Sequence, residues 1–211
     1  MDQTGQTRKQ PDEELETTFG NAMTELLAGR TAESLESLGR CLALDPRFAP
    51  AWSVRAGIHV REGRHEEAER DIEQALTLRP DHPGDLHNRA VVRTALGRYD
   101  QAIRDYEAVL RRDPESGGTW SNLAWVLATA PDPRVRDGKR AVRCARRALR
   151  QARTPAWLDT LAAALAETGD FERAIAVQEE ACDASDLTNT RFHRRLDGYR
   201  HGRTVVEGRR E

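Results

Sequence analysis

The sequence is poor in aromatic residues and has no long apolar segment. Aromatic residues make up 5% of the 211 residues, against 32% charged residues, and the mean hydropathy is −0.74. Such a composition provides a thin apolar core beneath much solvated surface. The longest apolar run, LAAALA from Leu161, is far too short to span a bilayer. We therefore expect no membrane segment.

Cysteine is also scarce, and the three cysteines do not form a pattern. Cys41, Cys144 and Cys182 lie far apart, with no CxxC or other metal-ligand spacing. We expect them to be small buried core residues in a reducing compartment. The first residues, MDQTGQTRKQPDEE, contain no apolar stretch, so no signal peptide is predicted. Together these features predict a cytoplasmic protein.

Motifs for catalysis are missing as well. The six histidines form no HExxH pair, and no GxSxG or GxGxxG occurs. Gly138 and Lys139 resemble the end of a phosphate-binding loop, but no Gly stands five residues before them and no Ser or Thr follows. We therefore predict no enzyme, no catalytic residue, no metal site and no cofactor. An accessory enzyme, with a site assembled across several helices, stays open as an alternative.

What the sequence does contain is a period of 34 residues. The stretch from Leu86 to Pro114 reads LHNRAVVRTALGRYDQAIRDYEAVLRRDP, and its residue types recur when it is shifted toward the N-terminus. One shift gives Trp52, Ala56, Gly63, Ala68, Leu76 and Pro80, and a second gives Ala22, Gly29, Leu35, Leu42 and Pro46. A fixed period of this length indicates stacked helical hairpins.

Each recurring residue type has a structural reason. Ala56 follows Trp52 by one helical turn on the same face, so the small side chain admits the next helix beside the large one. A glycine can take the left-handed conformation that ends the first helix, and a proline stops the second. The glycines are Gly29, Gly63 and Gly97, and the prolines are Pro46, Pro80 and Pro114. Such a hairpin buries its apolar face only by stacking on its neighbours.

At these positions the chain resembles the tetratricopeptide repeat (TPR) family. Three equally spaced prolines, each with a glycine 17 residues before it, make the match specific. The resemblance implies an all-α fold, a right-handed superhelix (α-solenoid) of about five helical hairpins with a C-terminal capping helix. It also implies a scaffold that binds other proteins.

The pattern divides the chain into consecutive segments. We expect a disordered tail over 1–12, hairpins at about 13–46, 49–80, 83–114, 117–153 and 155–186, a capping helix over 187–202, and a frayed tail over 203–211. The apolar face of the first helix is one residue out of register, which is typical of a terminal hairpin. Exposure of Phe19 or Met23 to a ligand is the alternative there.

The fourth hairpin departs from the repeat. From Trp120 to Ala141 the spacing is 21 residues, whereas the equivalent spacing is 16 in the other hairpins, so five residues are inserted within PDPRVRDG, residues 131–138. This hairpin is similar to an extended-turn repeat of bacterial TPR proteins. The inserted loop is either a recognition element or, more commonly, a tolerated surface insertion.

The TPR resemblance places a binding surface on the first helices of the hairpins, which line a concave groove. Asn88 and Asn122 occupy equivalent places there and form two rungs of the asparagine ladder found in peptide-binding TPR arrays. Trp125 is expected to add an apolar anchor, and His87 and Asp159 charge selectivity. The full candidate set is Val54, His87, Asn88, Val91, Ser121, Asn122, Trp125 and Asp159. Alternatively, the two asparagines only bond neighbouring helices.

One known type of TPR ligand is disfavoured. TPR adaptors that clamp the C-terminal carboxylate of chaperones carry Lys and Arg in this groove. The chain offers only Asn88 of that set, and Gly84 and Gly118 stand where a Lys is expected. We therefore predict that the chain is not a carboxylate clamp for chaperone tails.

A basic run from Arg134 to Arg153 contains nine Lys or Arg residues and one acid, Asp137. Arg143, Arg146, Arg147 and Arg150 share a helical face. Such a stripe either solvates an outer face, which we favour, or binds anions or nucleic acid. The formal net charge of −2 disfavours nucleic acid as the main partner. We predict a non-catalytic interaction module that binds an extended segment of a partner protein in its groove.

Overall fold

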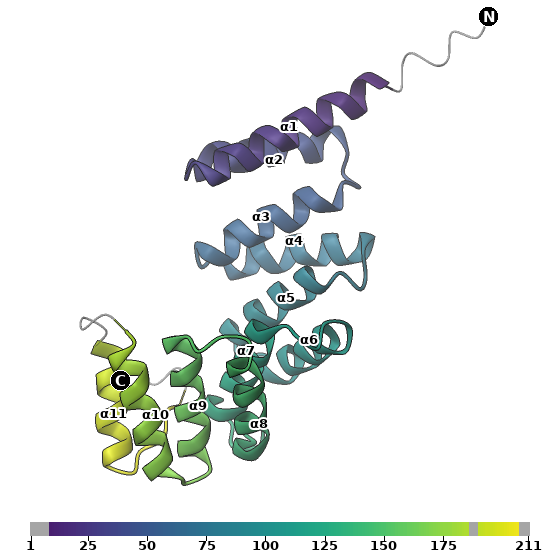
Figure 1. Cartoon of the computed structure of the whole chain (residues 1–211). Coiled ribbons are helices and arrows are strands. Elements are labelled where there is room, and N and C mark those ends of the chain that lie inside the picture. Colours follow the sequence, from purple (N-terminus) through teal and green to yellow (C-terminus); the bar gives the residue numbers. More distant parts are fainter. Residues whose placement is uncertain (1–8, 186–189, 207–211) are drawn as a thin grey trace, which may run out of the picture. The chain divides into compact units, whose positions relative to one another are not determined.

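The computed structural model describes residues 9–185 and 190–206, and within them the chain forms eleven α-helices and no strand (Figure 1). The all-α class and the hairpin order are therefore confirmed. The helices in chain order are α1 (Lys9–Leu27), α2 (Thr31–Leu44), α3 (Ala49–Arg61), α4 (His65–Leu78), α5 (Pro83–Ala95), α6 (Tyr99–Arg112), α7 (Gly117–Thr129), α8 (Gly138–Leu149), α9 (Pro155–Glu167), α10 (Phe171–Asp183) and α11 (Thr190–Arg200).

The chain divides into two compact units. Unit 1 ends at Leu96 and holds α1 to α5, and unit 2 begins at Gly97 and holds α6 to α11. The boundary falls in the turn of the third hairpin, between its first helix α5 and its second helix α6.

Unit 1 is built around apolar residues shared by successive helices. Phe19 is half-buried, and its ring meets that of Phe48 edge to face at 5.1 Å between centroids, so Phe19 packs inward. The indole N–H of Trp52 donates to the Pro46 carbonyl at 2.9 Å, which ties α3 to the segment after α2. The core cluster consists of Leu15, Ala22, Leu38, Cys41, Leu42, Ala51 and Ile58.

The turn glycines adopt the left-handed conformation that the repeat predicted. The backbone φ angles are +74° at Gly29, +70° at Gly63, +72° at Gly97 and +82° at Gly169. At the first of these turns, the Arg30 amide donates to the Glu25 carbonyl at 2.9 Å and the Gly29 amide to Leu26 at 3.1 Å. These bonds satisfy carbonyls at the end of α1 and turn the chain into α2.

Unit 2 places α9 between its neighbours, in contact with α7, α8 and α10. All nine residues from Leu158 to Ala166 are buried. The run LAAALA is thus a buried core segment, because its small side chains let three helices approach. No helix in the described ranges combines the length and the apolar character that crossing a bilayer requires. All three cysteines are buried, as expected.

The inserted loop of the fourth hairpin has its own polar contacts. Arg136 donates from Nε to Glu167 Oε1 at 2.9 Å and from Nη1 to the Ala130 carbonyl at 2.7 Å. Asp137 caps α8, because its carboxylate accepts from the Arg140 amide at 2.9 Å. These bonds replace the glycine turn that joins the helices of the other hairpins.

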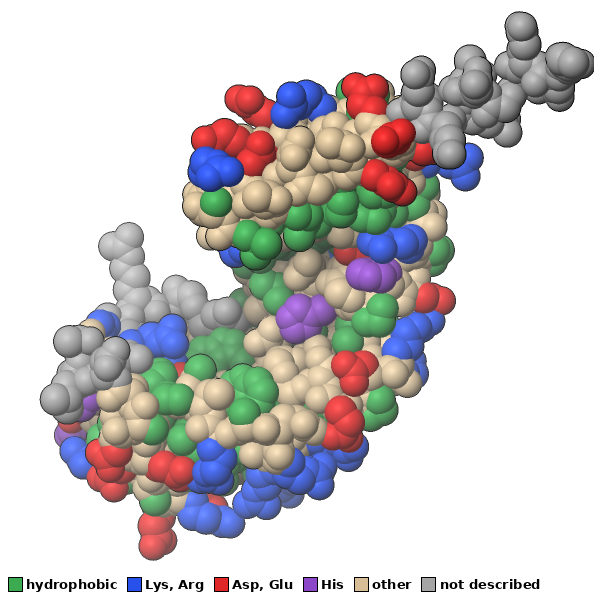
Figure 2. All heavy atoms as spheres, turned by 45° about the horizontal axis from the view of Figure 1, so that its top comes forward, with side chains coloured by type: hydrophobic (Ala, Val, Ile, Leu, Met, Phe, Trp, Pro, Cys, Tyr) green, Lys and Arg blue, Asp and Glu red, His purple; other side chains and the backbone are tan. Residues whose placement is uncertain are grey.

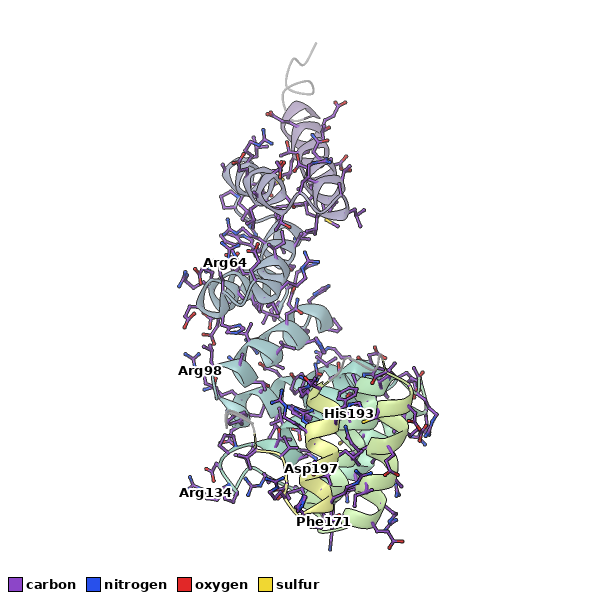
Figure 3. The ribbon with its side chains drawn as sticks, turned by 90° about the vertical axis from the view of Figure 1, so that its left-hand side faces the viewer. Arg64, Arg98, Arg134, Phe171, His193 and Asp197 are labelled. Carbon is purple, nitrogen blue, oxygen red and sulfur yellow. The ribbon has the colours of Figure 1, made fainter. Side chains whose placement is uncertain are left out.

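The ends of the chain differ from the expected tails. Helix α1 begins at Lys9, before the expected start near residue 13, and residues 1–8, 186–189 and 207–211 lie outside the described part. Beyond α11 the segment 203–206 folds back: Arg203 pairs with Asp197 at 3.1 Å and Val205 is buried. Figure 3 shows Asp197 and Phe171 near one end of α11 and His193 toward the other. The expected fraying therefore does not apply to 203–206.

The stacking register predicts the effect of enlarging a small interface residue. Ala90 on α5 is fully buried, so Ala90→Leu should overpack unit 1 and lower its free energy of unfolding by about 1 to 3 kcal/mol. Ala95→Leu on the same helix is the control, because Ala95 is exposed. Urea unfolding measures both variants. Equal stability of the two would show that the register of α5 is wrong.

Candidate functional site

The candidate residues lie on the first helices of their hairpins. We call the side formed by these helices the first-helix face: α3 contacts α5 in unit 1, and α7 contacts α9 in unit 2. Unit 1 carries Val54, His87, Asn88 and Val91, and unit 2 carries Ser121, Asn122, Trp125 and Asp159. Each unit thus presents half of the candidate set.

In unit 1 the four candidates are partly buried. Val54 packs against the core cluster of α1 to α3, so part of its side chain belongs to the core. Desolvation by burial lowers the pKa of His87. Because this value lies below the ordinary histidine pKa of about 6.5, the imidazole is neutral at pH 7. His87 would therefore act as a polar group and not as a cation.

The two candidate asparagines are polar residues that are half-buried on the first-helix faces. Asn88 on α5 and Asn122 on α7 are both half-buried. Within 9–185 and 190–206, no hydrogen bond joins either side-chain amide to another group. Each carboxamide therefore keeps a carbonyl acceptor and an NH₂ donor for an external partner. The alternative interpretation requires that they bond neighbouring helices, and no such hydrogen bond is present in the described residues.

Ser121 has a different environment. Its side chain is buried, and its hydroxyl donates to Thr160 Oγ1 at 3.3 Å. Thr160 in turn donates to the Ala156 carbonyl at 3.0 Å within α9. Ser121 therefore joins α7 to α9 beneath the surface.

Asp159 and Trp125 belong to one buried network. Asp159 is only 2% exposed, and its carboxylate accepts from Arg195 of α11 and, at 3.1 Å, from Gln178 Nε2 of α10. The Arg195 guanidinium also lies over the Trp125 ring, 4.6 Å from its centroid. Burial raises the pKa of the Asp159 carboxyl, and Arg195 and Gln178 act in the opposite direction. Asp159 thus presents no free carboxylate on the first-helix face.

Arg195 is the member of this buried network that sequence reasoning missed. The sequence predicted a capping helix over 187–202 and singled out none of its arginines, yet Arg195 is 7% exposed. The available signal was the acid Asp159 within the apolar run LDTLAAALA, because a buried carboxylate requires a partner. The sequence did not indicate which of the arginines of α11 supplies it.

No cluster of three or more His, Cys, Asp and Glu side chains suited to a metal ion occurs in the described part of the chain.

Comparison with known proteins identifies the class that this fold defines. Two family models, both described as tetratricopeptide repeat, match residues 54–141 and 19–83. Curated protein sequences give no match. The chain therefore belongs to the tetratricopeptide repeat family, whose repeats indicate a protein-interaction module.

Solved structures show the same fold at low sequence identity. A TPR protein from Parabacteroides merdae has a TM-score of 0.73 and 15% identity, covering 90% of this chain and 73% of its own. PilF from Pseudomonas aeruginosa has a TM-score of 0.71 and 19% identity, covering 91% and 86%. YrrB, described as a TPR protein with an unusual peptide-binding site, has a TM-score of 0.68 and 14% identity, covering 85% and 90%.

The buried ion pair predicts a strong effect of removing one partner. Arg195→Met leaves the Asp159 carboxylate buried without its counter-charge, so it should cost about 3 kcal/mol of unfolding free energy. Adding Asp159→Asn to that variant should recover part of the loss, because no unpaired charge then remains. Urea unfolding of the two single variants and the double variant measures the coupling.

The control is Arg200→Met on the same helix, because the Arg200–Glu179 pair is exposed and should contribute less than about 1 kcal/mol. In Arg195→Met the folded pKa of Asp159 lies above its unfolded value, so stability should fall as pH rises from the ordinary carboxyl range and recover on acidification. A loss no larger than that of Arg200→Met would contradict the buried pair.

Proposed function

We propose that the chain is a non-catalytic scaffold that binds an extended segment of a partner protein on its first-helix faces. The observation that carries this function is the pair of carboxamides on Asn88 and Asn122, which make no hydrogen bond within the described residues. They stand 34 residues apart, at the same place in consecutive repeats. A peptide backbone offers a donor and an acceptor to each of them, whatever its side chains.

The surrounding residues refine which side chains would contact the segment. Asn88, Val91 and His87 supply polar and apolar contacts in unit 1, with His87 neutral at pH 7. In unit 2, Trp125 is half-buried and the buried Arg195 guanidinium lies over its ring, so the segment would contact only the exposed part of the indole. Because Asp159 and Arg195 are buried and neutralise each other, Asp159 would not supply the charge selectivity expected from the sequence.

Two general considerations favour a peptide ligand. TPR proteins act generally as interaction scaffolds, and the similar structure of YrrB is described as having an unusual peptide-binding site. Gly84 and Gly118 still leave the chain without the lysines of a chaperone carboxylate clamp. A segment read through its backbone fits this chain better than one read through a terminal carboxylate.

The test uses peptides selected from a random linear library on the full-length chain. Asn88→Ala and Asn122→Ala, singly and together, should weaken a selected peptide, by about 1 to 3 kcal/mol in total for the double variant. This corresponds to roughly 5- to 150-fold in Kd. The melting temperature should move little, because neither carboxamide bonds to another helix. Isothermal titration and thermal melting provide the two measurements.

A matched control removes one exposed carboxamide from the second helices of each unit: Gln74→Ala on α4 and Gln101→Ala on α6. This control should bind like the parent. Parent-like binding by the Asn88→Ala, Asn122→Ala double variant, or a markedly lower melting temperature, would show that the asparagines are structural and that recognition lies elsewhere.

A further inference from the structure

The ion pairs of unit 2 divide the basic run of residues 134–153 into two groups. Five arginines pair with carboxylates, whereas the other four basic residues, Lys139, Arg143, Arg146 and Arg150, are exposed and have no ion-pair partner in the described part of the chain. The pairs are Arg134–Asp132, Arg136–Glu167, Arg140–Glu107, Arg147–Glu115 and Arg153–Glu180. Only part of the run is therefore already neutralised.

Arg147 leaves the face that the sequence assigned to it. Its guanidinium lies over the Trp120 ring, 5.4 Å from the centroid, and 3.5 Å from Glu115 Oε1. The free arginines of the stripe are therefore Arg143 and Arg146 on α8 and Arg150 at its C-cap, at spacings of three and four residues. These cations span about 10 Å along the helix. Arg146 also helps to lower the pKa of Asp170, but that carboxylate is bonded to Arg173.

A cavity of about 300 Å³ lies among α6, α7 and α8, and its lining residue Arg140 lies on α8 three residues before Arg143. Its floor is apolar and its rim is charged, and it is lined by Leu110, Leu123, Trp120, Glu107, Arg111 and Arg140. Arg140 binds Glu107 at the rim, and Arg111 is exposed without an ion pair in the described ranges. Figure 2 shows Lys and Arg side chains gathered along the lower edge of unit 2.

We propose that this outer face of unit 2, formed by Arg111, Arg143, Arg146, Arg150 and the cavity lined by Leu110, Leu123 and Trp120, docks an acidic segment of a partner protein that carries one apolar side chain. Guanidinium groups bind carboxylates through paired hydrogen bonds, and three of them in a row match successive carboxylates of one segment. The apolar floor beside them accepts the single apolar side chain.

The same contacts disfavour nucleic acid as the occupant. Glu107 lines the cavity, and its carboxylate would repel a phosphate backbone. Trp120 cannot serve as a stacking platform for a base, because Arg147 covers its ring and its indole N–H is bonded to the Pro114 carbonyl at 2.7 Å. An acidic protein segment would meet the same repulsion near this carboxylate, but it needs no stacking platform for a base.

The test measures binding of a fluorescein-labelled synthetic peptide of Glu and Asp with one central Leu to the full chain, by fluorescence anisotropy at low salt. Arg143→Gln, Arg146→Gln and Arg150→Gln together should weaken binding by at least about tenfold, because three charge-assisted contacts are lost. The control, Arg47→Gln with Arg61→Gln and Arg70→Gln, removes three exposed arginines of unit 1 without ion pairs and should bind like the parent.

Two further probes separate the components. Replacing the peptide's Leu by Ser should weaken binding by about tenfold if the cavity accepts that side chain. The Asn88→Ala, Asn122→Ala variant should bind the acidic peptide with unchanged affinity. The docking proposal for the outer face is therefore tested separately from the proposal for the first-helix face.

Several outcomes would overturn the proposal: no binding of the acidic peptide by the parent, an equal loss in the unit 1 control, or no effect of the Leu replacement. Tighter binding of a single-stranded oligonucleotide of equal charge, lost in the α8 triple variant, would also overturn it and assign the stripe to nucleic acid. Thermal melting checks that the triple variant is folded.

Discussion

The structure depends on one constraint: no hairpin of this repeat can bury its apolar face without a neighbour on which to stack. Close stacking requires small residues where helices cross, and Ala90, Ala124 and Ala162 are fully buried at such places. At the start of α7, a Cβ on Gly117 would lie 2.6 Å from Trp157 Cη2 of α9. The glycine turns and proline stops then follow, because each helix must end where its neighbour ends.

This close packing also determines where polar groups can be buried. A core made of alanine leaves room at its edges for side chains that cross from one helix to another, and the Asp159 carboxylate occupies such a place with Gln178 and Arg195. The pair links α9 to α11, and the Arg195 guanidinium continues to Trp125 on α7. Helix α11 thereby contributes a buried side chain beneath the first-helix face of unit 2.

Local sequence features predicted most of the fold but less of the site. The period gave the hairpins and the left-handed glycines, because each signal acts within one repeat. Asp159 and Arg195 are 36 residues apart and belong to a network that does not recur, so no repeat signal marks it. A helical wheel also assigned Arg147 to an exposed stripe, because it cannot show that Glu115 and Trp120 lie within reach. The partners of charged side chains come from other helices, and only the tertiary structure supplies them.

Unit 2 therefore offers two surfaces of different chemistry on helices that pack together. Asn122 and Trp125 lie on α7, on the first-helix face, whereas Arg143 and Arg146 lie on α8 and Arg150 is its C-cap. Ala124 of α7 and Ala141 and Ala145 of α8 are fully buried. Their close packing leaves little room for either helix to shift against the other. Because occupancy of one surface needs no movement of the other, two segments could bind without strong coupling. Independent binding of two segments is what a scaffold requires, since each partner then keeps its own affinity.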